Sequence, residues 1–176
     1  VIHIGDVMYD AAIVFANIAR ERSTILKDLE LEKDNYYLVT VHRAENTDAQ
    51  DRLTGIFEGL AEVAKDAPVV YPVHPRTKKF IDKYNLEKTC SALRIIKPIS
   101  FLDMVRLEGS AKAILTDSGG VQKEAYFHGV PCVTMRDETE WVETVDAGWN
   151  QIVGASKEKI VKAAQTASKG REITQY

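Results

Sequence analysis

Short apolar runs alternate with helical segments along almost the whole chain, and this alternation constrains the fold more than any other feature. The apolar runs consist of β-forming residues without polar alternation, which is typical of strands buried on both faces. We expect strands at residues 36–41, 69–73, 93–96, 113–115, 130–135 and 151–153, and an extended segment at 1–4. This order predicts an α/β protein with a Rossmann-like parallel sheet and helices on both faces.

The helical segments are marked by apolar residues that recur every three or four positions. They cover residues 8–22, 25–32, 53–65, 77–84, 101–108, 121–127, 141–146 and a final segment from 157. Four side chains are placed to cap helix starts: Asp6, Thr77, Ser100 and Ser156. Val1 stands inside an apolar run and no clear stop follows Tyr176, so we expect residues 1–176 to be one domain of a longer protein.

Charge and cysteine usage exclude several classes of protein. The net charge of −3 provides no basic field for a nucleic-acid backbone. No apolar run is long enough to span a membrane, and no secretion signal precedes the first helix. Cys90 and Cys132 lie far apart without the spacing of metal ligands. We therefore expect a cytoplasmic protein with two buried, reduced thiols, no metal site, and no nucleic-acid or membrane partner.

Residues 116–125 form the central motif: the end of an apolar strand, a polar turn and the start of a helix. Gly119 and Gly120 allow a sharp bend. Because the helix begins in the turn, its first N–H groups have no intrahelical acceptors, and they form an anion site together with the helix dipole. Glu124, one turn further, can accept hydrogen bonds from sugar hydroxyls. The alternative is a plain strand-to-helix turn that Ser118 caps.

Further polar and apolar candidates follow the other predicted strands. Ligands bind at the carboxyl ends of parallel strands, where all of these residues fall. His42, directly after a strand, can bind a diphosphate or protonate a leaving group. Its alternative is a solvated polar loop. Arg76, after the rigid Pro-Val-His-Pro segment at 72–75, can pair with a substrate anion or serve as a surface charge.

Two more segments at this edge carry weaker signals. Ile99 and Phe101 can form an apolar edge for a planar base, although core packing is the simpler interpretation of Phe101. The acidic run at 137–140 can touch sugar hydroxyls, but a solvated loop is the ordinary interpretation, and the run has no metal-ligand pattern. Loops at the opposite edge carry no comparable cluster, so the chain is expected to be a ligand-binding α/β domain.

The motifs together resemble a known family. Thr-Asp-Ser-Gly-Gly-Val-Gln-Lys-Glu-Ala at 116–125, Gly-Val-Pro at 129–131 and Met-Arg-Asp-Glu-Thr-Glu at 135–140 resemble the C-terminal half of the non-hydrolysing UDP-N-acetylglucosamine 2-epimerases. Val-His-Arg at 41–43 with Glu-Asn at 45–46, and Tyr-Pro-Val-His-Pro at 71–75, match two further family motifs in the right order. The resemblance covers nearly the whole chain.

This resemblance implies the C-terminal half of a two-domain fold like the B-type glycosyltransferases, with the N-terminal domain absent from this chain. It assigns a role to each candidate. Ser118, Gly119 and Gly120 would hold the diphosphate, Glu124 the ribose, and Ile99 the uracil. His42 would lie beside the diphosphate and help UDP leave.

The implied enzyme is an isomerase that interconverts UDP-N-acetylglucosamine and UDP-N-acetylmannosamine. UDP is eliminated to give a 2-acetamidoglucal, the C2 proton returns on the other face, and UDP adds back. The family needs no metal and no nicotinamide cofactor, and forms homodimers at full length. Its carboxylates that move the C2 proton belong to the N-terminal domain. The isolated chain is therefore expected to bind UDP weakly and to be inactive.

Some residues depart from the commonest family pattern. Trp141 stands where many bacterial members have arginine. Residues 5–11, 74–77 and 140–143 lean toward the branch that epimerises UDP-2,3-diacetamido-2,3-dideoxyglucuronate, or toward archaeal relatives. In that branch Arg76 would meet the extra carboxylate of the sugar. A UDP-sugar glycosyltransferase and a regulatory nucleotide-binding module remain as other classes.

Overall fold

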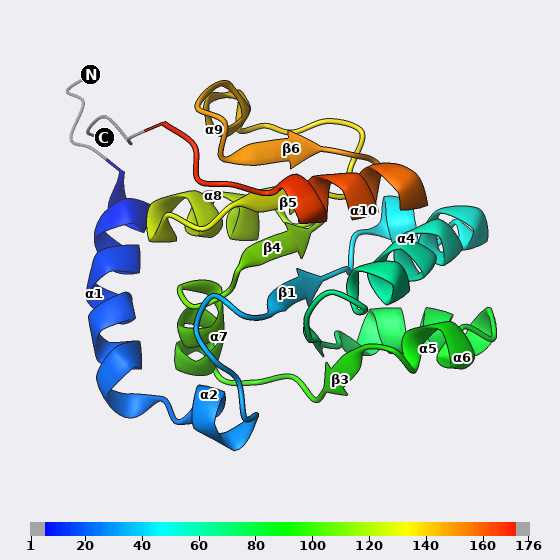
Figure 1. Cartoon of the computed structure of the whole chain (residues 1–176), viewed down its shortest axis with the longest axis horizontal. Coiled ribbons are helices and arrows are strands. Elements are labelled where there is room, and N and C mark those ends of the chain that lie inside the picture. The colour runs from blue at the N-terminus through cyan, green and yellow to red at the C-terminus, as the bar shows by residue number, and fades with distance from the viewer. Residues whose placement is uncertain (1–5, 172–176) are drawn as a thin grey trace.

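A single parallel sheet forms the centre of the computed structural model, which describes residues 6–171 (Figure 1). The extended segment predicted at 1–4 lies outside the described residues. The strands are β1 (Tyr37–Thr40), β2 (Val69–Pro72), β3 (Arg94–Ile96), β4 (Ala113–Thr116), β5 (Cys132–Thr134) and β6 (Asn150–Ile152). Their spatial order is β3-β2-β1-β4-β5-β6, so the direction of winding reverses between β1 and β4. The predicted Rossmann-like parallel sheet is confirmed.

Helices cover both faces of this sheet. They are α1 (Val7–Arg22), α2 (Ile25–Asp28), α3 (Ala44–Thr47), α4 (Gln50–Val63), α5 (Pro75–Lys83), α6 (Glu87–Cys90), α7 (Phe101–Glu108), α8 (Gly119–His128), α9 (Val142–Asp146) and α10 (Lys157–Thr166). Helices α4 and α10 pack side by side on one face, and α7 and α8 lie on the other, where α1 crosses both (Figure 1).

Side chains of β1 alternate between two apolar cores, as the pleat of a strand requires. Tyr37 and Val39 belong to the core with Phe57 of α4 and Ile160 of α10, while Leu38 belongs to the core with α7 and α8. Each fully buried side chain of this size contributes about 1.5–3 kcal/mol relative to exposure. Burial on both faces explains why the sequence of β1 shows no polar alternation.

Three of the four predicted helix caps are confirmed. Asp6 accepts from the Met8 N–H at 2.8 Å, Ser100 from the Asp103 N–H at 3.2 Å, and Ser156 from the Lys159 N–H at 3.4 Å.

The predicted cap at Thr77 is wrong. Helix α5 already begins at Pro75, and His74 caps it by accepting from the Arg76 N–H at 3.1 Å. Proline at the first helical position favours this earlier start, since it has no N–H to leave unpaired. Thr77 is instead buried and donates to the Val41 carbonyl.

Other element boundaries also differ from the prediction. The helix predicted at 25–32 ends at Asp28, because Glu30 has a left-handed backbone with φ of 47°. Helix α8 begins at Gly119, two residues before its predicted start, so both glycines of the turn belong to its first turn. The four-residue helices α3 and α6 were not predicted, since a single turn is too short to show a helical period.

The burial of the two cysteines and the absence of a membrane-spanning helix were both predicted from the sequence. Cys90 and Cys132 are both buried and unbonded to each other, as predicted. Within residues 6–171, no helix combines the length and the apolar character that a membrane span requires.

Candidate functional site

The site lies where the winding of the sheet reverses, at the carboxyl ends of β1 and β4. These two strands pair in parallel, with Thr40 opposite Thr116. Their hydroxyl oxygens are 2.5 Å apart, so the loops that follow leave the sheet side by side. A reversal of this kind opens a crevice, which is the usual ligand site of such sheets.

Asp117 ties the two loops together. Its carboxylate is fully buried and accepts hydrogen bonds from the backbone N–H groups of His42, at 3.0 and 3.1 Å, and Arg43, at 2.9 Å. The Asn46 amide donates to the same carboxylate at 3.1 Å and to the Met135 carbonyl at 2.9 Å. The sequence analysis assigned no role to Asp117. The sequence signal was its place in the turn, directly after a buried strand.

The turn from Ser118 to Gly120 leaves its donors available to a ligand. The Ser118 hydroxyl makes no capping hydrogen bond to α8, while the Ser118 N–H donates to the Thr116 hydroxyl at 2.9 Å. Gly120 is exposed, and a Cβ at this position would meet only the Ser118 Oγ, at 3.9 Å. The plain capped turn considered above is therefore not what forms. The surroundings of Gly120 in the first turn of α8 are open, as an anion site requires, whereas Gly119 is buried beside Glu140, Trp141 and Arg43.

His42 lies beside this turn. Its imidazole Nδ1 is 3.8 Å from an Asp117 carboxylate oxygen, and its side chain is 38% exposed. The His74 ring lies next to it, with ring centroids 5.8 Å apart. Asp117 therefore holds the backbone of His42, and the partly exposed imidazole is accessible to a ligand in the crevice.

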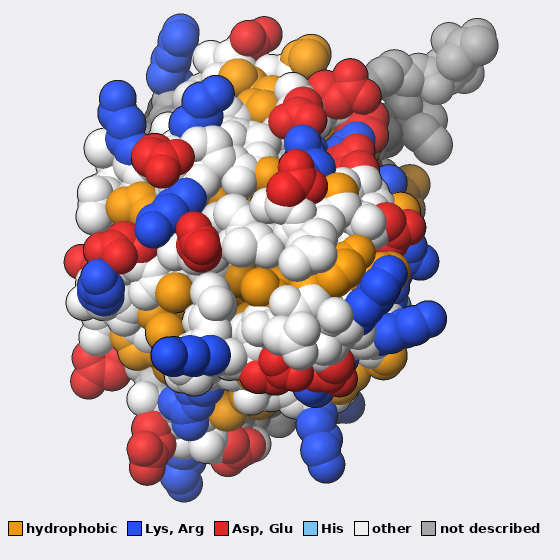
Figure 2. All heavy atoms as spheres, turned by 90° about the vertical axis from the view of Figure 1, so that its right-hand side faces the viewer, with side chains coloured by type: hydrophobic (Ala, Val, Ile, Leu, Met, Phe, Trp, Pro, Cys, Tyr) orange, Lys and Arg blue, Asp and Glu red, His pale blue; other side chains and the backbone are white. Residues whose placement is uncertain are grey.

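An apolar groove of about 600 Å³ continues from His42 across the ends of β1 and β2. It is lined by Thr40, Val41, His42, Pro72, Val73, His74, Pro75, Pro98, Ile99, Ser100, Phe101 and Met104. Phe101 is 56% exposed, so the prediction that it packs in the core is wrong. On the side of the molecule that Figure 2 shows, neutral and hydrophobic surface lies near the middle, and charged side chains of both signs gather mostly around it. The groove suits a flat, uncharged ring.

Glu124 is brought near the groove by the packing of α1, α7 and α8. It lines a small pocket with Met8, Phe15 and Phe101, and Phe101 also lines the groove. Burial raises the pKa of Glu124 above the ordinary carboxyl value. Burial, and then the charge of Glu124, raise the pKa of Glu108 well above its ordinary value. Two carboxyls in one apolar region cannot both ionise cheaply.

Arg76 is directed away from the turn. Its guanidinium binds both carboxylate oxygens of Asp48, at 2.7 and 2.9 Å, and its Nε donates to the Thr47 hydroxyl at 3.1 Å. These hydrogen bonds from Arg76 lower the pKa of Asp48. A contact between Arg76 and a substrate carboxylate stays a prediction, and it requires the guanidinium to exchange partners.

Arg136 organises the acidic loop, for which a solvated loop was the ordinary interpretation of the sequence and contact with sugar hydroxyls the alternative. The buried guanidinium donates to Glu45 at 3.0 Å and to both carboxylate oxygens of Glu140, at 2.9 and 3.1 Å. The hydrogen bonds lower the pKa of Glu140 and raise that of Arg136. Asp137 and Glu138 are exposed, as a solvated loop predicts. The overlooked signal was an arginine next to a dense group of carboxylates.

Within residues 6–171, no cluster of three or more His, Cys, Asp or Glu side chains has the arrangement of a metal site. The candidate site is therefore built from backbone N–H groups, one imidazole, one buried carboxylate and an apolar groove.

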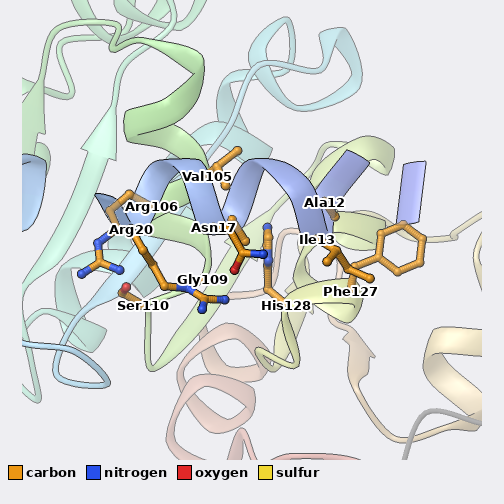
Figure 3. A pocket seen from close by; sticks show the side chains of 11 residues that line it. Ala12, Ile13, Asn17, Arg20, Val105, Arg106, Gly109, Ser110, Phe127 and His128 are labelled. Atoms are coloured by element: carbon orange, nitrogen blue, oxygen red, sulfur yellow. The ribbon is translucent and has the colours of Figure 1, made fainter. Parts of the chain in front are cut away.

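A smaller pocket, of about 180 Å³, lies at the opposite edge of the sheet (Figure 3). Arg20, Arg106 and His128 line it, and each belongs to the last turn of its helix. Helix C-termini carry partial negative charge, so the guanidinium groups of Arg20 and Arg106 complement the dipoles of their helices, whereas burial lowers the pKa of His128 and favours its neutral form. The same dipoles repel an anion. Sequence analysis missed this basic group because its members stand on helices and not in loops.

The order of the strands, the helix start at the reversal of winding and the neighbouring apolar groove define an α/β domain of the Rossmann-like class with a candidate ligand site at this edge of the sheet. Comparisons with known proteins narrow this class. The family model described as UDP-N-acetylglucosamine 2-epimerase matches residues 1–176. The chain belongs to this family, which confirms the resemblance seen in the sequence.

Similar proteins come from archaea and bacteria. The chain is 46% identical over 180 residues to the UDP-N-acetylglucosamine 2-epimerase homolog of Methanococcus maripaludis, covering 100% of this chain and 50% of that protein. It is 47% identical over 168 residues to the UDP-2,3-diacetamido-2,3-dideoxy-D-glucuronate 2-epimerase of Pseudomonas aeruginosa, covering 95% and 45%.

A solved structure is similar over almost the whole chain. The UDP-GlcNAc 2-epimerase of Methanocaldococcus jannaschii, in complex with UDP-GlcNAc and UDP, matches with a TM-score of 0.87 at 40% identity. The match covers 98% of this chain and 49% of that one. The chain thus spans about half the length of the relatives it matches.

Proposed function

We propose that this chain is the UDP-binding C-terminal domain of a UDP-N-acetylglucosamine 2-epimerase, an isomerase that interconverts UDP-N-acetylglucosamine and UDP-N-acetylmannosamine. The observation that carries the proposal is the turn anchored by Asp117, which starts α8 with open surroundings at Gly120, beside the loop whose His42 lines the apolar groove. An N-terminal domain, which this chain does not contain, completes the active site.

The three parts of UDP would occupy three neighbouring parts of the site. The diphosphate binds the N–H groups of Gly119 and Gly120 and the hydroxyl of Ser118. The uracil lies in the groove at Ile99, where a flat ring fits between apolar side chains. The ribose reaches Glu124, and the position of Phe101 between groove and Glu124 supports this arrangement.

The reaction breaks the bond between C1 of the sugar and the diphosphate oxygen while a base removes the C2 proton. The residues of this chain act on the leaving group. The helix start neutralises the charge that develops on the diphosphate, and His42 donates a hydrogen bond or a proton to it. Carboxylates of the N-terminal domain remove the C2 proton and return it on the other face, after which UDP adds back.

We also propose an oligomeric state and a cellular compartment for the enzyme. The full-length protein forms a homodimer and acts in the cytoplasm on a nucleotide sugar, and the two unpaired thiols support a reducing compartment.

A second substrate is favoured by one observation, the 47% identity to the UDP-2,3-diacetamido-2,3-dideoxy-D-glucuronate 2-epimerase of Pseudomonas aeruginosa. In this version the site and the chemistry are unchanged, and Arg76 leaves Asp48 to bind the extra carboxylate of the sugar.

One experiment tests both versions. The full-length protein is incubated with each UDP-sugar in deuterated water, and incorporation at C2 is followed by NMR. We expect deuterium at C2 of at least one sugar, because only an epimerase exchanges that proton. No exchange on either sugar would favour a glycosyltransferase or a regulatory module. Equal loss of activity on both sugars in Arg76→Ala would contradict a role specific to the sugar carboxylate.

The raised pKa of Glu124 predicts how UDP binding depends on pH. The ionised carboxylate accepts from both ribose hydroxyls, and protonation removes part of this capacity. The affinity of the full-length protein for UDP should therefore fall as the pH is lowered through the raised pKa of Glu124. Isothermal titration across this range measures the effect.

The matched variant is Glu124→Gln, which cannot titrate. The diphosphate also gains a proton as the pH falls, and the variant reports every contribution other than that of Glu124. The proposal requires a steeper loss of UDP affinity in the natural protein than in Glu124→Gln. Parallel curves would remove Glu124 from the ribose site.

A further inference from the structure

The carbonyl of Gly119, at the start of the diphosphate turn, is held by a side chain from another part of the chain. The indole Nε1 of Trp141 donates to this carbonyl at 2.8 Å. Trp141 precedes α9 on the loop that follows β5, whereas Gly119 is the first residue of α8. The contact therefore joins the acidic loop to the helix start.

This hydrogen bond acts on the peptide that links Gly119 to Gly120. A trans peptide is planar, and its carbonyl and N–H point in opposite directions. A carbonyl fixed toward Trp141 directs the Gly120 N–H away from it. A Cβ on Gly120 would meet only the Ser118 Oγ, at 3.9 Å, so open space surrounds this residue. Glycine has the greatest backbone freedom, so a peptide between two glycines gains most from an external restraint.

The indole is itself held from two sides. The Lys123 ammonium lies 4.0 Å from the centroid of the Trp141 ring, in cation–π geometry. Lys123 is 11% exposed at its side chain and forms an ion pair with Asp6 at 2.6 Å. The backbone N–H of Trp141 donates to the Thr139 hydroxyl at 3.1 Å and fixes the main chain that carries the indole. These contacts leave the indole little freedom to turn away from Gly119.

We propose that Trp141 is a positioning residue for the diphosphate of a UDP-sugar: its indole N–H fixes the Gly119–Gly120 peptide so that the Gly120 N–H faces the diphosphate, and Lys123, paired with Asp6, holds the indole. This inference rests on the proposed function, since it assigns the diphosphate to this turn. It concerns a residue that touches the turn and not the ligand.

The test compares two ligands that share the groove but not the turn. UDP uses both, whereas uridine has no phosphate. In the full-length protein, Trp141→Phe keeps an aromatic ring as a partner for Lys123 but replaces the indole by a smaller ring without an N–H donor. We expect a loss of about 5- to 10-fold in UDP affinity, the size of one hydrogen bond. The affinity for uridine should stay unchanged. Isothermal titration measures UDP, and NMR titration measures uridine.

The matched control is Trp149→Phe, because the Trp149 indole also donates to a backbone carbonyl, that of Arg171 at 2.8 Å, away from the turn. It should change neither affinity. Lys123→Met provides a second variant that keeps the indole N–H, and it should weaken UDP but not uridine.

The measurements distinguish a failure of the positioning role from a failure of the proposed function. Unchanged UDP affinity in Trp141→Phe, or equal losses for UDP and uridine in both site variants, would overturn the positioning role. Failure of the natural protein to bind UDP would instead overturn the proposed function. Should Trp141→Phe lose its fold by circular dichroism, the Lys123→Met result decides.

Discussion

Substituting His42 with Gln should lower kcat of the full-length enzyme by about 10²- to 10⁴-fold, the range that a positioned acid or base contributes. Glutamine can still donate a hydrogen bond to the diphosphate, but it cannot transfer a proton. Since the helix start and the groove remain, the affinity for UDP should change little. Steady-state kinetics with UDP-N-acetylglucosamine measures the first quantity, and titration with UDP the second.

The same pair of measurements can contradict the role of His42. A variant that binds UDP much more weakly but keeps its kcat would make His42 a binding residue. A variant with both values unchanged would remove it from the site. Because the His42 N–H, and not the ring, is the main partner of Asp117, the backbone of the loop should persist in His42→Gln.

The second large effect concerns stability. Asp117→Ala should lower the free energy of unfolding by about 3–5 kcal/mol, because it removes the shared acceptor of two backbone N–H groups and of one of the two hydrogen bonds that the buried Asn46 amide donates. That is a large share of the total for a domain of this size, about 5–15 kcal/mol. Urea unfolding followed by circular dichroism measures the loss.

Two further variants locate the origin of this effect. Asp117→Asn keeps one acceptor oxygen and should fall between the natural protein and Asp117→Ala. Asp48→Ala removes an exposed carboxylate paired with Arg76 and should leave the stability nearly unchanged, because such pairs are well solvated. A loss in Asp48→Ala as large as that in Asp117→Ala would contradict the importance of burial.

Most strands and helices could be predicted from the sequence, because the local pattern of apolar and polar residues determines them. Strands buried on both faces are continuous apolar runs, and β1 and β4 appear as such. The order of the strands was not readable, since periodicity says nothing about which strands pair. The short helices α3 and α6 were not predicted, because a single turn is too short to show a helical period. The start of α5 depended on Pro75, and the proline outweighed the capping residue Thr77.

The site was only partly readable. The turn at 118–120 and His42 were predicted as candidates because glycines and a histidine directly after buried strands are distinctive, and the structure brings the two segments together through Asp117. Asp117 was missed as an anchor because its partners are backbone N–H groups of a loop more than 70 positions away. Phe101 was predicted to pack in the core, because an aromatic residue at the start of a helix is usually buried, but it is exposed. Arg76 was expected to face the site, but its partner Asp48 comes from another part of the chain.

The bonds to Asp117 also determine when the site can exist during synthesis and folding. His42 and Asp117 are 75 positions apart, and the paired Thr40 and Thr116 are 76 positions apart. The chain between them includes β2, β3 and their helices. Contacts between such distant positions are slow to form, since a long loop must close before any of them is made. A nascent chain that has exposed β1 but not Asp117 lacks the acceptor of the His42 and Arg43 N–H groups, and the edge of β1 that pairs with β4 is still unpaired. The proposed UDP site can therefore form only after Asp117 has left the ribosome.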